Sequence, residues 1–148
     1  MTIRRAASWT ATYAAWLLSC GLGVVIQLLL RQTLRIAADL AGAGQLAVTV
    51  IDRFVLLFAA IALIAVIVFT EHYLREGLRK KRIGERVAGV FGIELLTVFV
   101  LHSFITTAVG MGVQPVQWAL LAGEAVGGTA LVVYRRQLRR KRLARRTR

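Results

Sequence analysis

The chain has 148 residues, of which 57% are hydrophobic, and its mean hydropathy is +0.66. Soluble domains are usually about 45–50% apolar, so this excess argues against a soluble globular protein. The net charge is +13 although only 18% of the residues are charged, so the charges are concentrated in a few segments. Apolar blocks separated by basic segments are typical of a polytopic membrane protein, and we expect no nucleic-acid partner.

Length and cysteine content set two further limits. A chain of 148 residues allows one compact bundle and no second domain. Cys20 is the single cysteine, so an intrachain disulfide and a cysteine metal cluster are both excluded.

The first apolar segment is uncharged from Ala6 to Leu30. The apolar core of a signal peptide is only about 7–15 residues long, so we predict a retained membrane-spanning helix over 9–30. Three aromatic residues share one face near its start and indicate an interfacial aromatic belt. The alternative is a contact surface for a quinone, a pigment or a lipid headgroup. The three residues are Trp9, Tyr13 and Trp16.

The second span is predicted over 53–70, where Phe54 to Phe69 contains no charged residue. Lipid covers every face of such a helix, and the helix satisfies its own backbone hydrogen bonds. In the preceding connection, apolar residues between Leu34 and Ala41 favour a short helix lying in the membrane interface. The Gly42-Ala43-Gly44 stretch is expected to end that helix.

Two more spans are predicted over 87–109 and 116–134. Gly110, Gly112 and Pro115 form a short uncharged turn between them, which makes these two spans antiparallel neighbours. Residues 135–148 follow as a basic tail. The sequence therefore predicts an all-α, integral membrane four-helix bundle.

The distribution of Lys and Arg predicts the orientation. With four spans, Arg4 and Arg5, the connection 71–86 and the tail all fall on one side. Basic residues resist translocation, so this side is expected to be cytoplasmic, with both termini inside and the chain in the inner (cytoplasmic) membrane. Eight basic residues are expected to contact anionic lipids. These residues are Arg79, Lys80, Lys81, Arg82, Arg135, Arg136, Arg139 and Arg140. The alternative is that the tail docks an acidic partner or contacts nucleic acid.

Small residues recur at fourfold spacing in three spans, which permits close helix approach in lipid. We expect the first and fourth spans to pack through these stripes. The alternative is that the face with Gly123 and Gly127 binds another copy or another subunit. The first span has Ala15, Ser19 and Gly23, the third has Ala88 and Gly92, and the fourth has Ala119, Gly123 and Gly127.

Four polar side chains stand out within the spans: Gln27, Glu94, His102 and Glu124. A charged group near the bilayer centre costs about 2.5–3.5 kcal/mol or more, so each should be neutral, paired or facing water. His102 and Glu124 lie within about one helical turn in depth, which predicts a polar cluster of these two with Gln27. Glu94 is expected on the inner half of its span. The cluster would relay protons or hold a cation or lipid headgroup; the alternative is a structural hydrogen bond.

A haem with two histidine ligands is excluded within one chain by position. His72 lies beyond the inner end of the second span, whereas His102 lies in the outer half of the third. We expect no cofactor and no metal site, because too few ligands are present.

The sequence leaves three function classes to compare. The favoured class is a non-enzymatic accessory or assembly subunit of a larger membrane complex. The second is an oligomeric transporter or channel for protons, cations or a lipid-linked solute, using Glu94, His102 and Glu124. The third, a lipid enzyme, is disfavoured because no paired carboxylates or Ser–His arrangement occurs at a membrane surface.

Overall fold

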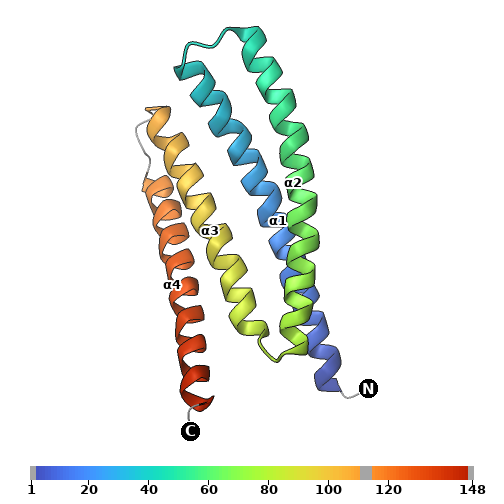
Figure 1. Ribbon diagram of the computed structural model, residues 1–148. Coiled ribbons are helices and arrows are strands. Elements are labelled where there is room, and N and C mark those ends of the chain that lie inside the picture. Colours follow the sequence, from blue (N-terminus) through green and yellow to red (C-terminus); the bar gives the residue numbers. More distant parts are fainter. Residues whose placement is uncertain (1–2, 111–114, 147–148) are drawn as a thin grey trace.

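The computed structural model describes residues 3–110 and 115–146, which form four helices. Figure 1 shows the helices running alternately up and down, with both ends of the chain and the α2–α3 turn at the same end of the molecule. The predicted all-α, four-helix architecture is confirmed. The helices are α1 (Ile3–Leu40), α2 (Gln45–Arg79), α3 (Ile83–Ala108) and α4 (Pro115–Arg146).

All four helices are long and apolar enough to cross a membrane. Even α3, the shortest with 26 residues, is about 39 Å long at 1.5 Å per residue, whereas the hydrocarbon core of a bilayer is about 30 Å thick. The accessible surface is 10580 Å² for a 16.3 kDa chain, against roughly 7,500 Å² for a soluble globular protein of that mass. The additional accessible surface must therefore be in contact with something other than water.

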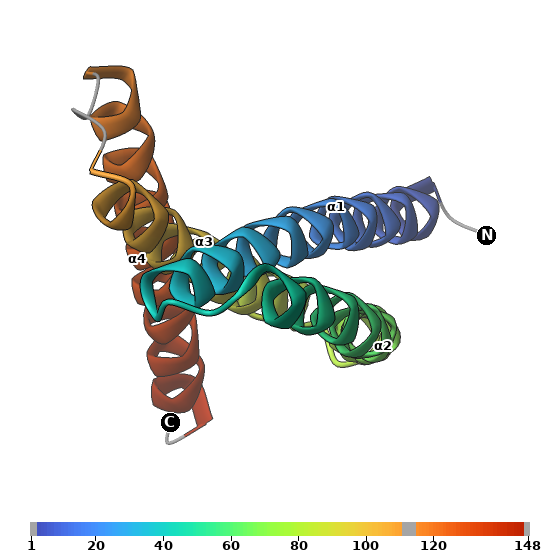
Figure 2. The same ribbon diagram turned by 90° about the horizontal axis from the view of Figure 1, so that it is seen from above.

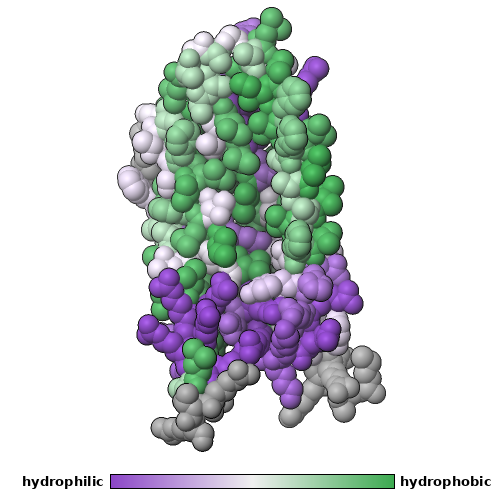
Figure 3. All heavy atoms as spheres, viewed as in Figure 1, coloured by the Kyte–Doolittle hydropathy of each residue, from purple (hydrophilic) through white to green (hydrophobic). Residues whose placement is uncertain are grey.

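Much of the exposed surface is apolar. On α2, large side chains such as Leu57, Phe58, Ile61 and Phe69 are exposed. Figure 3 shows hydrophobic residues over most of the visible face above a hydrophilic band near the lower end. The fold is therefore that of a multi-pass membrane protein, whose lipid-facing residues are the ones that a soluble protein would bury.

The α3 helix is the one on which the others pack. It lies against α4 on one side and against α1 and α2 on the other. Among the described residues, no Cα atom of α4 comes within 8 Å of α1 or α2. The arrangement is therefore more open than a closed four-helix bundle, as the view from above shows (Figure 2).

In the described part of the chain, the first span packs through its small residues, but not against the fourth span. The small residues of α1 face other helices instead: Ser19 contacts α3 through Glu94, and a Cβ on Gly23 would lie 2.8 Å from Leu63 of α2. The physical reason is that α3 occupies the position between α1 and α4, so α4 can reach only α3.

The α3–α4 contact depends on glycines that face each other's helix. A Cβ added to Gly92 of α3 would lie 2.9 Å from a methyl group of Val132 and 3.3 Å from its backbone nitrogen. A Cβ on Gly128 of α4 would lie 2.9 Å from Leu96. These two helices are antiparallel neighbours, as predicted, and their backbones approach closely because both glycines lack a side chain.

The expected interfacial helix between Leu34 and Ala41 is not a separate element. The α1 helix continues without a break to Leu40, because no Gly or Pro lies between Gly23 and Gly42. Gly42 ends the helix with a positive φ of 71°, in a conformation that favours glycine. The α2 helix starts at Gln45, so the segment 45–52 is continuous with the second span.

Two arginines and one aspartate hold this extended part of α1 against α2. Arg31 and Arg35, one turn apart on α1, each donate two hydrogen bonds to the carboxylate of Asp52. The four N···O distances lie between 2.5 and 3.0 Å. Such forked pairs are charge-assisted and geometrically specific, so they oppose bending of α1 into the membrane plane.

At the other end of the molecule, Arg86 fixes the α2–α3 turn. Its guanidinium lies 4.3 Å from the ring centroid of Tyr73, donates to the Tyr73 carbonyl and is 2.9 Å from Glu76. Its aliphatic chain crosses Gly77, where an added Cβ would lie 2.6 Å from it. A planar guanidinium suits all these contacts at once, whereas a lysine ammonium does not.

The basic tail is helical in its described part. The α4 helix continues past Tyr134 to Arg146, and Arg142 lies 3.2 Å from Glu85 at the start of α3. Arg142 also donates to the carbonyl of Lys81 at 3.4 Å. The tail is thus attached to the α2–α3 connection.

Replacing Gly92 by Ala is expected to destabilise the α3–α4 contact by about 1–3 kcal/mol, because the methyl group overlaps Val132. The measurement is thermal or denaturant unfolding of the purified protein in mild detergent. Gly21→Ala is the control, since its added Cβ meets nothing within 4 Å. Equal stability of the two variants would contradict the proposed packing.

Candidate functional site: polar groups between the helices

His102 of α3 and Glu124 of α4 contact each other between these helices. The Nδ1 atom of His102 lies 3.1 and 3.3 Å from the two carboxylate oxygens of Glu124. The His102 and Glu124 side chains are 25% and 18% exposed. His102 and Glu124 are thus close together, as their depths in the membrane predicted. Neighbouring antiparallel helices bring residues of similar depth side by side.

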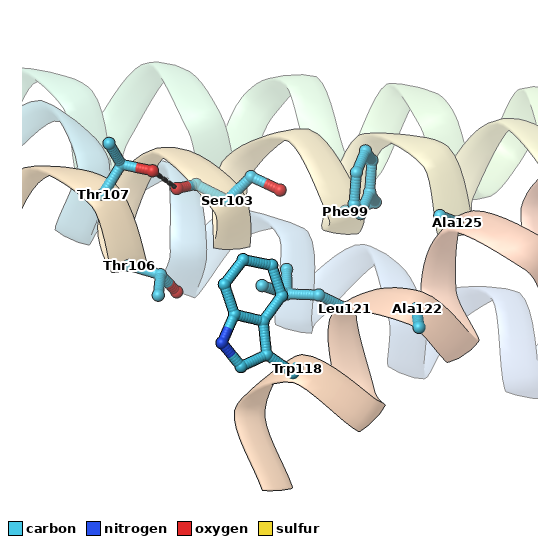
Figure 4. Close-up of a pocket in the computed structure, with 8 residues that line it drawn as sticks. All are labelled: Phe99, Ser103, Thr106, Thr107, Trp118, Leu121, Ala122 and Ala125. Atoms are coloured by element: carbon cyan, nitrogen blue, oxygen red, sulfur yellow. Dashed lines mark hydrogen bonds between the residues drawn. The ribbon is translucent and has the colours of Figure 1, made fainter. Parts of the chain in front are cut away.

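A cavity of about 330 Å³ lies beside this pair, also between α3 and α4. Figure 4 shows the Trp118 ring of α4 between the helices, with the Ser103 hydroxyl of α3 near it. The hydroxyls of Thr106 and Thr107 donate to the backbone carbonyls of their own helix one turn earlier, so they offer little to a ligand. The cavity is mainly apolar and suits a lipid chain.

Glu94 of α3 is the most deeply buried carboxylate of the described chain and faces α1. Its residue is 9% exposed, and its Oε1 accepts a hydrogen bond from the hydroxyl of Ser19, which is 4% exposed. Its Oε2 is buried and has no hydrogen-bond partner among the described residues. Sequence reasoning placed Glu94 within its span but did not identify Ser19 as its partner.

Gln27 lies with Glu94 and not with His102. Both line a cavity of about 310 Å³ between α1, α2 and α3. The predicted cluster is therefore divided: His102 and Glu124 lie on the α4 side of α3, and Gln27 and Glu94 on the α1–α2 side. The cause is the rotation of each helix about its axis, which depth alone does not specify. The residues that line the cavity are Gly23, Ile26, Gln27, Leu30, Ala59, Ala62, Leu63, Val66, Ile93, Glu94 and Thr97.

The aromatic residues of α1 have two different surroundings. Trp16 donates from its indole nitrogen to the Ile67 carbonyl of α2 at 3.2 Å, so it links these helices. Tyr13 is exposed, and its ring stacks on that of Trp9 with 6.1 Å between centroids. Trp9 lines a cavity of about 340 Å³ with His72, Arg75, Glu76 and Arg79, a place suited to a lipid headgroup.

The expected lipid-contacting basic residues gather at the end of the molecule that holds both termini (Figure 1). Two of these eight basic residues contact other parts of the chain. Lys80 pairs with Glu76, and Arg135 lies over Gly89 of α3. Arg79, Lys81, Arg136, Arg139 and Arg140 are exposed, and Arg82 is partly exposed. The side chains of Arg4 and Arg5, and the whole of Gly112, lie outside the described residues.

No cluster of three or more His, Cys, Asp or Glu side chains that could hold a metal is found in residues 3–110 and 115–146. Comparisons with known protein families, with curated proteins and with solved structures find no match to this chain. The functional argument therefore rests on the geometry alone.

We expect His102 and Glu124 to be energetically coupled. A double-mutant cycle with His102→Ala and Glu124→Ala, measured by unfolding in bicelles, should give a coupling of about 0.6 kcal/mol and not more than about 1.7 kcal/mol. A second cycle, with His102→Ala and Glu94→Ala, is the control and should give none, since Glu94 faces α1. Coupling that is absent from the first cycle would contradict the contact.

Proposed function

We propose that this chain is a non-enzymatic accessory or assembly subunit of a larger membrane complex. The supporting observation is the outward face of α4. Ala119, Gly123, Val126 and Ala130 follow helical spacing on the side turned away from α3, and all four are exposed. A Cβ added to Gly123 would meet no atom within 4 Å. Small residues on a lipid-facing helix allow another helix to approach closely, so this face suits a neighbouring subunit.

The polar contacts support a structural role for the chain's interior. His102 with Glu124, and Ser19 with Glu94, each connect two helices by side-chain contacts. A bundle whose helices are joined in this way forms a stable scaffold, while α4 retains a free side for assembly.

The proposal includes an orientation: both termini lie in the cytoplasm and the chain resides in the cytoplasmic membrane. The support is that basic residues of the α2–α3 connection and of the α4 end lie at one end of the molecule (Figure 3). Anionic lipids of the cytoplasmic leaflet attract such residues by about 1 kcal/mol each.

Cysteine labelling tests this orientation. In a Cys20→Ser background, Gly44→Cys should react with a membrane-impermeant maleimide in intact spheroplasts, because the α1–α2 turn is then outside. Lys81→Cys, in the α2–α3 turn, should react only after permeabilisation. The opposite pattern would show that the proposed orientation is wrong.

The assembly proposal is tested by adding bulk to the outward face of α4. Gly123→Leu should remove the chain from its heteromeric complex in mild detergent, as measured by native mass spectrometry, because the side chain blocks helix approach. Thr129→Leu is the control, an exposed position on the flank of α4. A monomeric wild-type chain, or a complex that tolerates Gly123→Leu, would count against the proposal.

A second candidate function is an oligomeric proton or cation transporter. The contact of His102 with Glu124 and the unpartnered oxygen of Glu94 favour it. The same purification separates the two functions: a homo-oligomer that dissipates a proton gradient in liposomes supports transport and contradicts the subunit proposal.

A further inference from the structure

We infer that the cavity between α1, α2 and α3 binds a lipophilic cation, that is, a small molecule with an apolar body and a protonated amine. This site is independent of the proposed assembly through α4, which lies on the other side of α3. Three observations support it: the state of the Glu94 carboxylate, the lining of the cavity, and its depth.

The carboxylate offers one free oxygen. Glu94 is buried to 9% exposure, its Oε1 accepts from Ser19, and its Oε2 has no hydrogen-bond partner among the described residues. A buried polar group without a partner is destabilising, and the structure does not compensate this one. Glu94 lines the cavity, so a donor that reaches Oε2 from there would supply the missing partner.

The charge of the Glu94 carboxylate favours a cation as that donor. No Lys, Arg or His is among the described residues that line the cavity. The other carboxylate within the spans, Glu124, has His102 beside it, so only Glu94 lacks a basic neighbour of this kind. An ammonium group compensates a carboxylate charge and forms a charge-assisted hydrogen bond, which is stronger in a medium of low dielectric constant.

The lining and the depth define the rest of the ligand. Most lining residues are apolar, and the cavity of about 310 Å³ suits a compact hydrocarbon body. The Gln27 amide adds a second polar group to the lining. Glu94 lies seven residues after the predicted start of the third span at Val87, roughly 10 Å along the helix. Lipid headgroups stay at the membrane surface, so the ligand is a small molecule that dissolves in the bilayer.

The test measures saturable binding of radiolabelled 1-adamantylamine to the full chain in phosphatidylcholine nanodiscs, after subtraction of empty nanodiscs. Glu94→Gln keeps an acceptor for Ser19 but removes the charge, and it should weaken binding by at least about tenfold. The matched control Glu124→Gln should bind like wild type. The neutral analogue 1-adamantanol should not distinguish wild type from Glu94→Gln.

A second variant covers the case in which Glu94→Gln does not fold. Ala62→Phe fills the cavity from an exposed position on α2 and keeps the carboxylate, so it should also abolish saturable binding. Absence of saturable binding to wild type, or wild-type affinity in Glu94→Gln or in a folded Ala62→Phe protein, would overturn the inference. Equal losses in Glu94→Gln and Glu124→Gln would also overturn it, since binding would then not be specific to this cavity.

Discussion

A polar side chain within the hydrocarbon of a bilayer needs a partner on a neighbouring helix, because lipid offers none. In this chain α3 meets that requirement on two sides, with Glu94 against Ser19 of α1 and His102 against Glu124 of α4. The same helix carries Gly92, which allows α4 to approach. The positions of α1 and α4 therefore both follow from the rotation of α3 about its own axis.

The helices are held together differently at the two ends of the molecule. Arg86 ties the start of α3 to α2 through Tyr73, Glu76 and the space above Gly77. At the opposite end Asp52 joins α1 to α2 through Arg31 and Arg35. The α1–α2 pair is thus one unit and the α3–α4 pair another, joined mainly along α1–α3 and at the Arg86 turn. The open side of α4 results from this pairing.

The sequence predicted the helices and the depth of their residues in the membrane, but not the rotation of each helix about its own axis. Long apolar segments predicted the four helices, and helical rise placed His102 within about one turn of Glu124 in depth. Depth could not show that Gln27 faces the Glu94 cavity, because that depends on how α1 is turned. The continuous extension of α1 to Leu40 was also missed, because the apolar residues between Leu34 and Ala41 favoured an interfacial helix and did not indicate that Arg31 and Arg35 pair with Asp52. The i, i+4 spacing of these arginines was the available signal.

Few large or small apolar side chains are buried: Leu74, Ala88, Val98 and Leu121 form that set among the described residues, and of these Leu74 is the most deeply buried. The heat capacity of unfolding in soluble proteins comes from apolar groups that become exposed to water. When helices separate within a bilayer, their apolar faces meet lipid tails instead, so this change in hydration is nearly absent. The stability of this fold should therefore vary only weakly with temperature through hydration, and the physical state of the surrounding lipid becomes the main thermal influence on it.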